Sequence, residues 1–325
     1  MASMSDVAKL AGVSVSTVSL VCNNKSNVSD EMRARVQRAM QQLDYQPSQL
    51  ARSLKLGRSG IIGVIVPDLA HPFFAEFVAH LEHELQAKGF KTMVCGTAGR
   101  EEVEQSYLDM LEQKTMDMLI MGAHSLDVSR YISVSRPLIA LDRLLSDTIP
   151  TIRADKMQIA RMAAELFLSR GRHKVVQLVS SGTIRDYDHE KDVEFRRLLE
   201  LEGVEVVDVP VGFNCFTVEQ NKQVVRRVFD EVDGFDGVLA TDLAIAACLA
   251  EARRVGISVP EDLSLVAIDG TYLSRALPQT MTAIVQPLDA YARKAAELAE
   301  QLVRDGDLKP GDQIFEVHLQ QGETL

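Results

Sequence analysis

The sequence predicts an α/β protein in which a small all-helical head precedes a larger body of parallel sheets. Two observations lead to this prediction. From Gly60 onward, short apolar runs alternate with amphipathic segments of ten or more residues, which is typical of buried parallel strands covered by helices. Residues 1–60 have helical periodicity instead, and their eight Lys and Arg against four Asp and Glu give +4, which leaves −15 for the rest of a chain whose net charge is −11. We therefore expect the head, and not the acidic body, to meet a polyanion.

The first two helices are expected to form a helix-turn-helix. Ser5 and Asp6 can cap the first helix, Gly12 can end it with a positive φ, and Ser14 can cap the second. Short hydroxyl side chains would let the second helix enter a major groove and donate to phosphates and base edges. Two packed helices with no role in DNA binding are the alternative interpretation. The side chains expected to face outward from the second helix are Val15, Ser16, Ser19 and Leu20.

A third helix and a basic linker complete the head. The third helix is expected to follow the cap Ser29, and Tyr45 is expected to close the small core. Residues 47–59 are expected to form a hinge helix and linker, with a short helical stretch that ends at Gly57 and has a narrow apolar face flanked by Arg and Lys. This stretch is either a plain domain linker or a hinge helix that pairs with its copy in a dimer and wedges base steps apart in the minor groove.

The body is expected to consist of two doubly wound halves, because it has more strand-length apolar runs than one such sheet needs. A closed eight-stranded barrel is the alternative. The final segment DQIFEVHL and the run MTAIVQP favour two sheets, since they are typical of crossovers and edge strands. The strand-length runs are IIGVIVP, KTMVCG, DMLIMG, PLIALD, KVVQLVSS, VDVPV, DGVLAT, LSLVAID and MTAIVQ.

Several segments, taken in order, resemble the lactose/purine repressor (LacI/GalR) family of bacterial transcription regulators. The resemblance implies a helix-turn-helix domain at 1–46, a hinge helix at 47–59, and a two-lobed, periplasmic-binding-protein-like body at 60–325. It further implies a homodimer, with a tetramer left open, that represses by binding a palindromic DNA operator and responds to a small metabolite. The segments that carry it are DVAKLAGVSVSTVS, VSDEMRARVQRAMQQLDYQP, ARSL, GVIVPDLAHPFFAEF, GVLATDLAIAACLAEARRVGISVPEDLSLVAIDG and MTAIVQP.

The resemblance also assigns DNA contacts. It implies that Val15, Ser16 and Leu20 lie at base edges and that Leu54 intercalates in the minor groove. Leu20 stands where many relatives carry Arg or His, so an apolar contact, for example with a thymine methyl, would replace a hydrogen bond to guanine. The full set of candidate DNA contacts is Ser5, Val15, Ser16, Thr17, Ser19, Leu20, Asn23, Ala51, Leu54 and Lys55.

Candidate effector contacts follow the strands of the body, because open α/β sheets bind ligands at the carboxyl ends of their strands. Carboxylates can bind paired hydroxyls and a Phe ring can stack on sugar C–H groups, so a polyhydroxylated ligand is expected. Each Asp could instead cap the following helix, and one of the two adjacent Phe is expected in the core. The candidates are His71, Phe73, Phe74, Asp142, Arg143, Asp155, Lys191, Phe216, Asp242 and Asp269.

Charged residues near this cleft depart from the family pattern. Lys191 and Lys156 stand where relatives often have Arg and Asn, and Arg143 and Arg185 lie nearby in the sequence. An ammonium does not recognise the same groups as an Arg fork, so the ligand is expected to be a sugar or a phosphorylated or acidic derivative.

The sequence disfavours other classes of protein. It has no GxGxxG after a strand, no GxxxxGK[ST], no HExxH and no GxSxG, so we expect no enzyme and no cofactor. The four Cys and the dispersed His lack ligand spacing, so neither disulfides nor a metal site is expected. Without an apolar span or an export signal, we expect a cytoplasmic protein. A solute-binding protein without a regulatory role is the alternative function, since it would share the body but not the head.

Overall fold

The chain divides into two compact units, Met1–Ser59 and Gly60–Leu325. The structure is a computed structural model that describes residues 2–22, 28–46, 57–122, 125–180, 187–212, 216–305 and 311–325. Asn23, most of the predicted hinge helix with Ala51, Leu54 and Lys55, and the cationic Arg185 lie outside these residues, so what was predicted for them stays a prediction.

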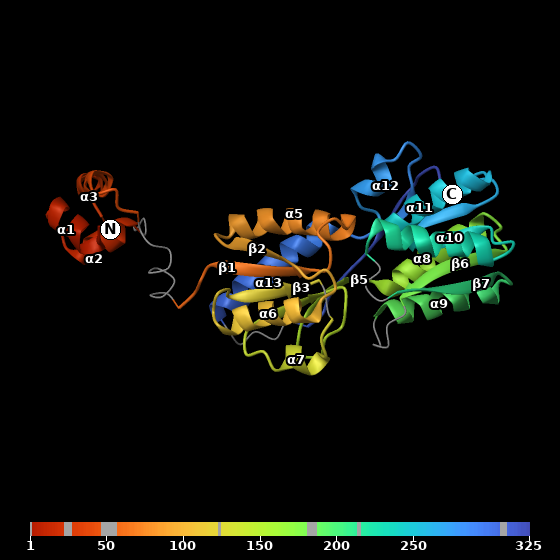
Figure 1. The fold of residues 1–325 in the computed structure, drawn as a ribbon, viewed down its shortest axis with the longest axis horizontal. Coiled ribbons are helices and arrows are strands. Elements are labelled where there is room, and N and C mark those ends of the chain that lie inside the picture. The colour runs from red at the N-terminus through yellow and green to blue at the C-terminus, as the bar shows by residue number, and fades with distance from the viewer. Residues whose placement is uncertain are drawn as a thin grey trace. The chain divides into compact units, whose positions relative to one another are not determined.

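The described part of the head contains three helices, coloured red in Figure 1: α1 (Met4–Ala11), α2 (Val15–Cys22) and α3 (Asp30–Gln42). The apolar spacing of the sequence turns one face of each helix inward. Val7, Val18 and Val36 are fully buried at the centre of the resulting core. Within the described ranges no single helix is long and apolar enough to span a membrane. Only α1 and α2 together pass that test, as a pair bent by 105°.

Capping interactions at the end of α1 and the start of α2 stabilise the predicted turn between these helices. Gly12 ends α1 with φ +63°, as expected, and the backbone N–H of Thr17 donates to Ser14 Oγ at the start of α2. The prediction for the first cap was wrong, because Ser3 and not Ser5 precedes α1. Ser3 and Asp6 form a reciprocal capping box, which satisfies two backbone donors at once, whereas Ser5 lies inside the helix and is exposed.

The body contains two six-stranded sheets, which confirms the predicted pair of doubly wound halves and excludes the barrel. The first sheet has the order β11-β5-β4-β3-β1-β2 and is parallel throughout. Helices α5 and α13 pack together on this lobe, while α6 and α7 contribute to a second apolar cluster against it (Figure 1). The elements of this N-terminal lobe are β1 (Ile61–Val66), α5 (Pro72–Ala87), β2 (Lys91–Gly96), α6 (Glu101–Glu112), β3 (Met118–Met121), α7 (Val128–Ile132), β4 (Leu138–Leu141), β5 (Thr151–Ala154), α13 (Leu288–Asp305) and β11 (Gln313–Phe315).

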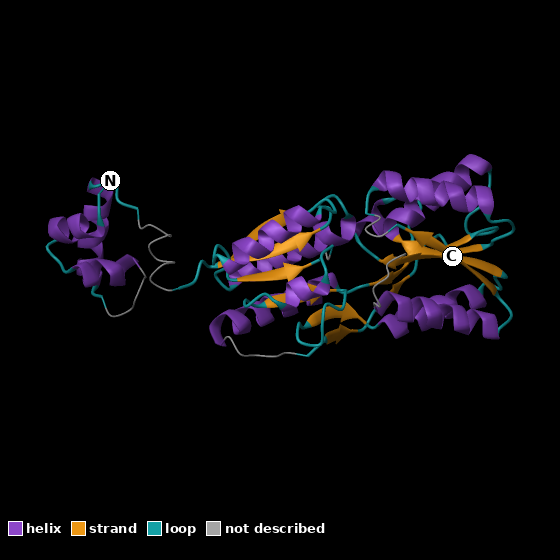
Figure 2. Cartoon of the chain, turned by 60° about the horizontal axis from the view of Figure 1, so that its bottom comes forward, coloured by secondary structure: helices purple, strands orange, loops and turns teal. Residues whose placement is uncertain are grey.

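The second sheet has the order β12-β10-β9-β8-β6-β7, in which only β12 is antiparallel to its neighbour. Helices cover both faces of it (Figure 2), with α8 packed on α9 and α10 packed on α11. The elements of this C-terminal lobe are α8 (Lys156–Ser169), β6 (Lys174–Ser180), α9 (Tyr187–Leu201), β7 (Glu205–Val211), α10 (Val218–Glu231), β8 (Gly237–Thr241), α11 (Asp242–Val255), β9 (Ser264–Asp269), α12 (Tyr272–Ala276), β10 (Thr282–Val285) and β12 (His318–Gln320).

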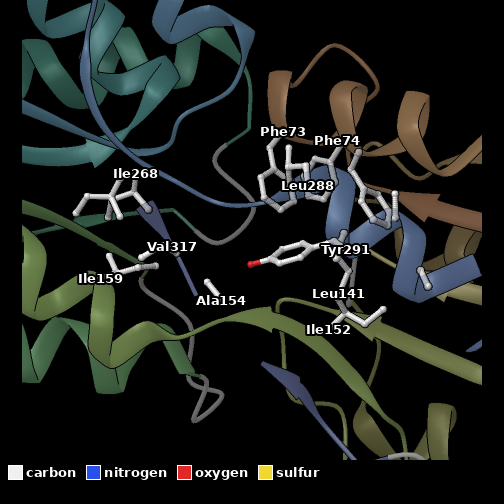
Figure 3. Packing of buried hydrophobic residues seen from close by; sticks show 14 of the residues in the cluster. Phe73, Phe74, Leu141, Ile152, Ala154, Ile159, Ile268, Leu288, Tyr291 and Val317 are labelled. Atoms are coloured by element: carbon white, nitrogen blue, oxygen red, sulfur yellow. The ribbon is translucent and has the colours of Figure 1, made fainter. Parts of the chain in front are cut away.

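The chain crosses between the lobes after β5, after β10 and after β11. The last crossing divides the segment DQIFEVHL into β11 in the first sheet and β12 in the second, as predicted. Strand β5 was not predicted, because Arg153 interrupts its apolar run. One buried cluster contains residues of both lobes, and Figure 3 shows Tyr291 of α13 with its hydroxyl directed toward the region where they meet. The carboxyl ends of the strands of both sheets therefore come together there.

Candidate functional site

The second helix of the head presents a small, mostly exposed surface. Val15 is 46% exposed and Ser16 is exposed, while Thr17 and Ser19 are half-buried. Ser14 Oγ lies 2.7 Å from Ser16 Oγ and 2.9 Å from Thr17 Oγ1, so the cap residue links three hydroxyls at the start of the helix. Leu20, predicted to face outward, is half-buried and packs on the head core. The helix therefore offers hydroxyl donors and one small apolar side chain.

A cavity of about 190 Å³ lies between the two lobes of the body, at the carboxyl ends of their strands. It is lined on one side by the loop and helix that follow β1 and on the other by α9 and by residues after β7 and β9. The predicted candidates that line it are His71, Phe73, Phe74, Asp142, Arg143, Lys191, Phe216 and Asp269, whereas Asp155 and Asp242 do not. Rings and carboxylates predicted from separate segments thus meet at one cavity.

An aromatic wall lines the cavity, with His71, Phe73 and Phe74 from the N-terminal lobe and Phe216 from the segment between β7 and α10. The ring centroids of His71, Phe74 and Phe216 are 5.4–5.5 Å apart in pairs, in tilted or edge-on arrangements. Phe73 packs edge-on against Phe74, and both are buried and line the cavity, so the expectation that only one would do so was wrong. Pro72 begins α5 directly after His71, and this places Phe73 and Phe74 in the first turn of the helix.

His71 is a neutral polar group in this wall. Its side chain is 7% exposed, its Nδ1 has no hydrogen-bond partner in the protein, and it makes no cap bond to α5. Burial lowers the pKa of His71 to about 4, although Asp68 opposes this shift. At neutral pH the imidazole is therefore uncharged and presents a nitrogen that a bound hydroxyl could satisfy.

A buried ion network centred on Lys156 adjoins the cavity, and its carboxylates Asp142 and Asp188 line the cavity. Lys156 Nζ donates to Asp142 Oδ2 at 2.8 Å and lies 3.0 Å from Asp188 Oδ1, so it joins the end of β4 in one lobe to α9 in the other. Burial raises the pKa of Asp188, but Lys156 and Lys191 outweigh burial and lower it to about 2. Burial likewise opposes the charge of Lys156, yet the two carboxylates raise its pKa. Burial raises the pKa of Asp142, although Lys156 opposes this shift.

One carboxylate oxygen of Asp142 is available to a partner other than Lys156. Its Oδ1 is buried and unpartnered, and its backbone has φ +62°, a left-handed conformation that is rare for residues other than Gly. Asp269 also lines the cavity at a strand end and has φ +113°. Gln286 Nε2 donates to Asp269 Oδ1 at 2.8 Å, and burial raises the pKa of Asp269 well above its usual range. Strained backbone of this kind is typical of functional sites.

The two lysines of the cleft, Lys156 and Lys191, have neighbours of opposite charge. Lys191 Nζ lies 2.5 Å from Asp192 Oδ1, and Lys156 has its two carboxylates. Burial opposes the charge of Lys191, but Asp192 and Asp188 raise its pKa. Lys156 and Lys191 therefore offer little net charge to a phosphorylated or acidic ligand. The cation Arg143 also lines the cavity, so the expectation of such a ligand stays a prediction. In the same residues no group of three His, Cys, Asp or Glu could hold a metal ion.

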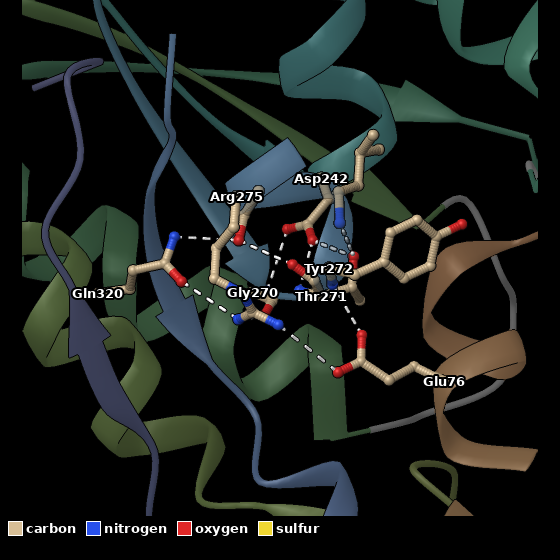
Figure 4. Close-up of polar contacts among 9 residues, drawn as sticks. Glu76, Asp242, Gly270, Thr271, Tyr272, Arg275 and Gln320 are labelled. Atoms are coloured by element: carbon tan, nitrogen blue, oxygen red, sulfur yellow. Dashed lines mark hydrogen bonds and ion pairs between the residues drawn. The ribbon is translucent and has the colours of Figure 1, made fainter. Parts of the chain in front are cut away.

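Asp155 and Asp242 have other roles. Asp155 caps α8 by accepting from the backbone N–H of Gln158 at 2.9 Å. Asp242 is 2% exposed and accepts from the N–H of Gly270 at 3.1 Å, the N–H of Thr271 at 2.7 Å and Thr271 Oγ1 at 2.6 Å (Figure 4). Burial raises the pKa of Asp242 to about 6, against these bonds. Its carboxylate fixes the turn that follows the cavity residue Asp269.

A contact between the lobes begins from the same turn. Glu76 of α5 accepts from the backbone N–H of Tyr272 at 2.7 Å and lies 3.8 Å from Arg275 Nη2 (Figure 4). Glu76 lies on α5, the helix that also carries Phe73 and Phe74 of the aromatic wall. Sequence reasoning missed Glu76, Asp188 and Asp192, because each lies within a helix and not at a strand end. For Asp188 and Asp192, the one sequence signal was Lys191, which lies between them and stands where relatives often have Arg.

Comparison with known proteins covers both units. Residues 3–48 match the family "Bacterial regulatory proteins, lacI family", and residues 59–280 match "Periplasmic binding proteins and sugar binding domain of LacI family". The chain is 30% identical to the sucrose operon repressor of Streptococcus mutans, over 100% of this chain and 99% of that protein. It is 31% identical to the ribose operon repressor of Halalkalibacterium halodurans, over 96% of this chain and 92% of that protein.

Solved structures show a similar fold. The Lac repressor bound to ONPG in its repressed state has a TM-score of 0.82 at 24% identity and covers 100% of this chain and 99% of its own. The complex of the transcriptional regulator CelR with cellobiose has a TM-score of 0.71 at 23% identity, and all of both chains is covered.

Proposed function

This chain belongs to the lacI family of bacterial regulatory proteins, and from that premise we propose that it is a repressor whose affinity for operator DNA is set by a neutral saccharide bound between the lobes of its body. The relatives named above are repressors of a sucrose operon and of a ribose operon, which supports both repression and a sugar ligand. They are transcription regulators and not enzymes.

The head supplies the DNA contacts in this proposal. The described contacts are Ser5, Val15, Ser16, Thr17, Ser19 and Leu20, with Leu20 offering only the exposed part of its side chain. The predicted hinge contacts Ala51, Leu54 and Lys55, and Asn23 after α2, complete the set. A Lac repressor dimer has been solved on its operator, which supports a homodimer on a palindromic site and leaves a tetramer open. A regulator that binds operator DNA would act in the cytoplasm.

One observation carries the choice of a neutral saccharide. Asp142 Oδ1 and His71 Nδ1 are both buried, both lack a partner in the protein, and both belong to residues that line one cavity. A buried polar atom without a partner costs about 1–3 kcal/mol, which a ligand hydroxyl would recover. The aromatic wall suits the C–H faces of a sugar ring, and Lys156 and Lys191, paired with carboxylates, give little advantage to a phosphate.

Regulation follows from the different affinities of the ligand for the two degrees of lobe closure. Lys156 and Glu76 each join one lobe to the other, so a change in closure makes or breaks polar contacts between the lobes. A saccharide between the lobes stabilises whichever closure satisfies its hydroxyls, and operator affinity changes by the same coupling free energy. A solute-binding protein without a regulatory role, the alternative from the sequence, would carry no lacI-family head at residues 3–48.

A thermal-shift screen tests the proposal. The full chain is heated with neutral sugars, with the corresponding sugar phosphates and with nucleosides, and we expect stabilisation by neutral sugars, because a ligand that binds only the folded protein raises its stability. Asp142→Asn and His71→Leu should each remove most of the shift. Stabilisation by sugar phosphates or nucleosides alone would contradict a neutral saccharide ligand.

A further inference from the structure

A second hollow, here called the outer groove, adjoins the cavity. Phe216 lines both, and the outer groove has a volume of about 650 Å³ against about 190 Å³ for the cavity. Its N-terminal wall is formed after β1 and β2 by Pro67, Asp68 and Leu69 and by the loop that leads to Glu101. These are again carboxyl ends of parallel strands, where α/β sheets bind their ligands.

The surface of the outer groove combines an apolar platform with uncharged or acidic polar groups. Leu69 is 50% exposed although it is a large apolar side chain, and it lies in the groove with the half-buried Phe216. Thr217 and Gln220 at the start of α10 add a hydroxyl and an amide. No Lys or Arg occurs among the described residues that line it, so this lining suits a neutral polyhydroxylated group and not an anion.

Hydrogen bonds within the protein hold the floor and rim of the outer groove. The backbone N–H of Ala98 donates to the carbonyl of Pro67 at 3.0 Å, which ties the loop after β2 to the end of β1. On the other wall, Thr217 and Gln220 form a reciprocal capping box, with Gln220 Oε1 accepting from the Thr217 N–H at 3.1 Å and from its hydroxyl at 2.9 Å. A preformed surface of this kind loses little entropy on binding.

We propose that the outer groove is a second saccharide subsite, so that the effector has at least two sugar rings, one in the cavity and one on Leu69 and Phe216. This inference rests on the proposed function. The cavity alone is smaller than the about 300–1,000 Å³ that ligand pockets usually enclose, whereas the two hollows together fall within that range. Leu69 and Gln220 are the specificity-determining residues for the second ring.

Isothermal titration of the full chain tests the subsite with ribose, fructose and glucose against sucrose, maltose and cellobiose. We expect the best disaccharide to bind at least about tenfold more tightly than the best monosaccharide, roughly the effect of one added hydrogen bond or one apolar contact. Leu69→Ala and Gln220→Glu should each weaken disaccharide binding by about fivefold to tenfold and leave monosaccharide binding unchanged. Gln220→Glu keeps the oxygen that closes the capping box, so the fold is retained.

The matched control is Leu201→Ala, which shortens an exposed leucine of α9 that lines neither hollow and should change no affinity. If a monosaccharide binds as tightly as any disaccharide, the subsite is wrong and the proposed function stands. If disaccharides bind more tightly but Leu69→Ala and Gln220→Glu have no effect, the second ring lies elsewhere and the subsite is also wrong. If no saccharide binds at all, the proposed function fails together with the subsite.

Discussion

Replacing Lys156 by Met should destabilise the body by about 3–5 kcal/mol at pH 7, because the substitution keeps the volume of the side chain and leaves two carboxylates without their cation. Lys156 is 4% exposed and bridges Asp142 and Asp188 at 2.8 and 3.0 Å. Part of the loss can be worked out from Asp188 alone. Its pKa is about 2 against 3.8, which corresponds to about 2 kcal/mol at about 1.4 kcal/mol for each pKa unit.

The pH dependence of this loss has a definite sign. In the wild type the lowered pKa of Asp188 gives a stability that is present above pH 3.8 and is lost only as pH falls through about 2. In the Lys156→Met variant, burial and mutual repulsion would raise the pKa of both carboxylates, so the variant loses stability as pH rises through those pKa values. The difference between the two proteins should therefore narrow as pH falls from 7 to 4.5.

Urea unfolding followed by circular dichroism, at pH 7 and at pH 4.5, measures both effects. The control is Lys222→Met, because Lys222 pairs with Glu219 on an exposed surface and should change stability by less than about 0.5 kcal/mol. A Lys156→Met variant as stable as the wild type at pH 7, or a loss of the same size at both pH values, would refute the reasoning.

Three further predictions concern the lobe contact, the aromatic wall and the head. Glu76→Ala removes the acceptor of the Tyr272 N–H and should weaken saccharide binding about tenfold by calorimetry; unchanged affinity would show that ligand binding does not depend on this contact. Because the pKa of His71 is lowered to about 4, its contribution to stability is complete above pH 6.5 and should fall by up to about 3 kcal/mol as pH drops through 4. Thermal melts of His71→Leu should lack this component, and identical pH profiles would contradict it. Gly12→Ala places a Cβ at φ +63°, 2.9 Å from Arg35 Nη2, and should destabilise the head by about 1 kcal/mol or more in a circular-dichroism melt; an unchanged melt would count against the strained turn.

The strand-end rule explains which parts of the cavity could be predicted from the sequence. A carboxylate directly after a buried parallel strand must lie at the ligand edge of the sheet, which correctly placed Asp142 and Asp269 at the cavity. The same rule selected Asp155 and Asp242, which bind the backbone instead. Asp142 and Asp269 have positive φ, whereas Asp155 has φ −69° and caps a helix. No local sequence signal distinguishes these conformations.

The ion network could not be predicted for a different reason. Lys156, Asp142 and Asp188 come from the start of α8, the end of β4 and the first turn of α9, so only tertiary packing brings them together. The sequence showed the cations of the cleft but not their partners, which is why an acidic ligand was expected. In the head, by contrast, helix periodicity and caps are local, and the buried positions Val18 and Val36 followed from spacing alone.

The central claim is that the head reads double-stranded DNA and that a saccharide between the lobes controls how tightly it does so. The most direct measurement is the affinity of the full chain for a palindrome selected from random DNA, by fluorescence anisotropy with and without the sugar that stabilises the protein most. Coupling between two sites in one protein is typically about 5-fold to 150-fold, and the proposal predicts a change of that order, together with a clear preference for the selected site over random duplex. Equal affinity for the selected site and for random duplex would contradict this claim. An affinity for the selected site that does not change at saturating sugar would contradict it as well.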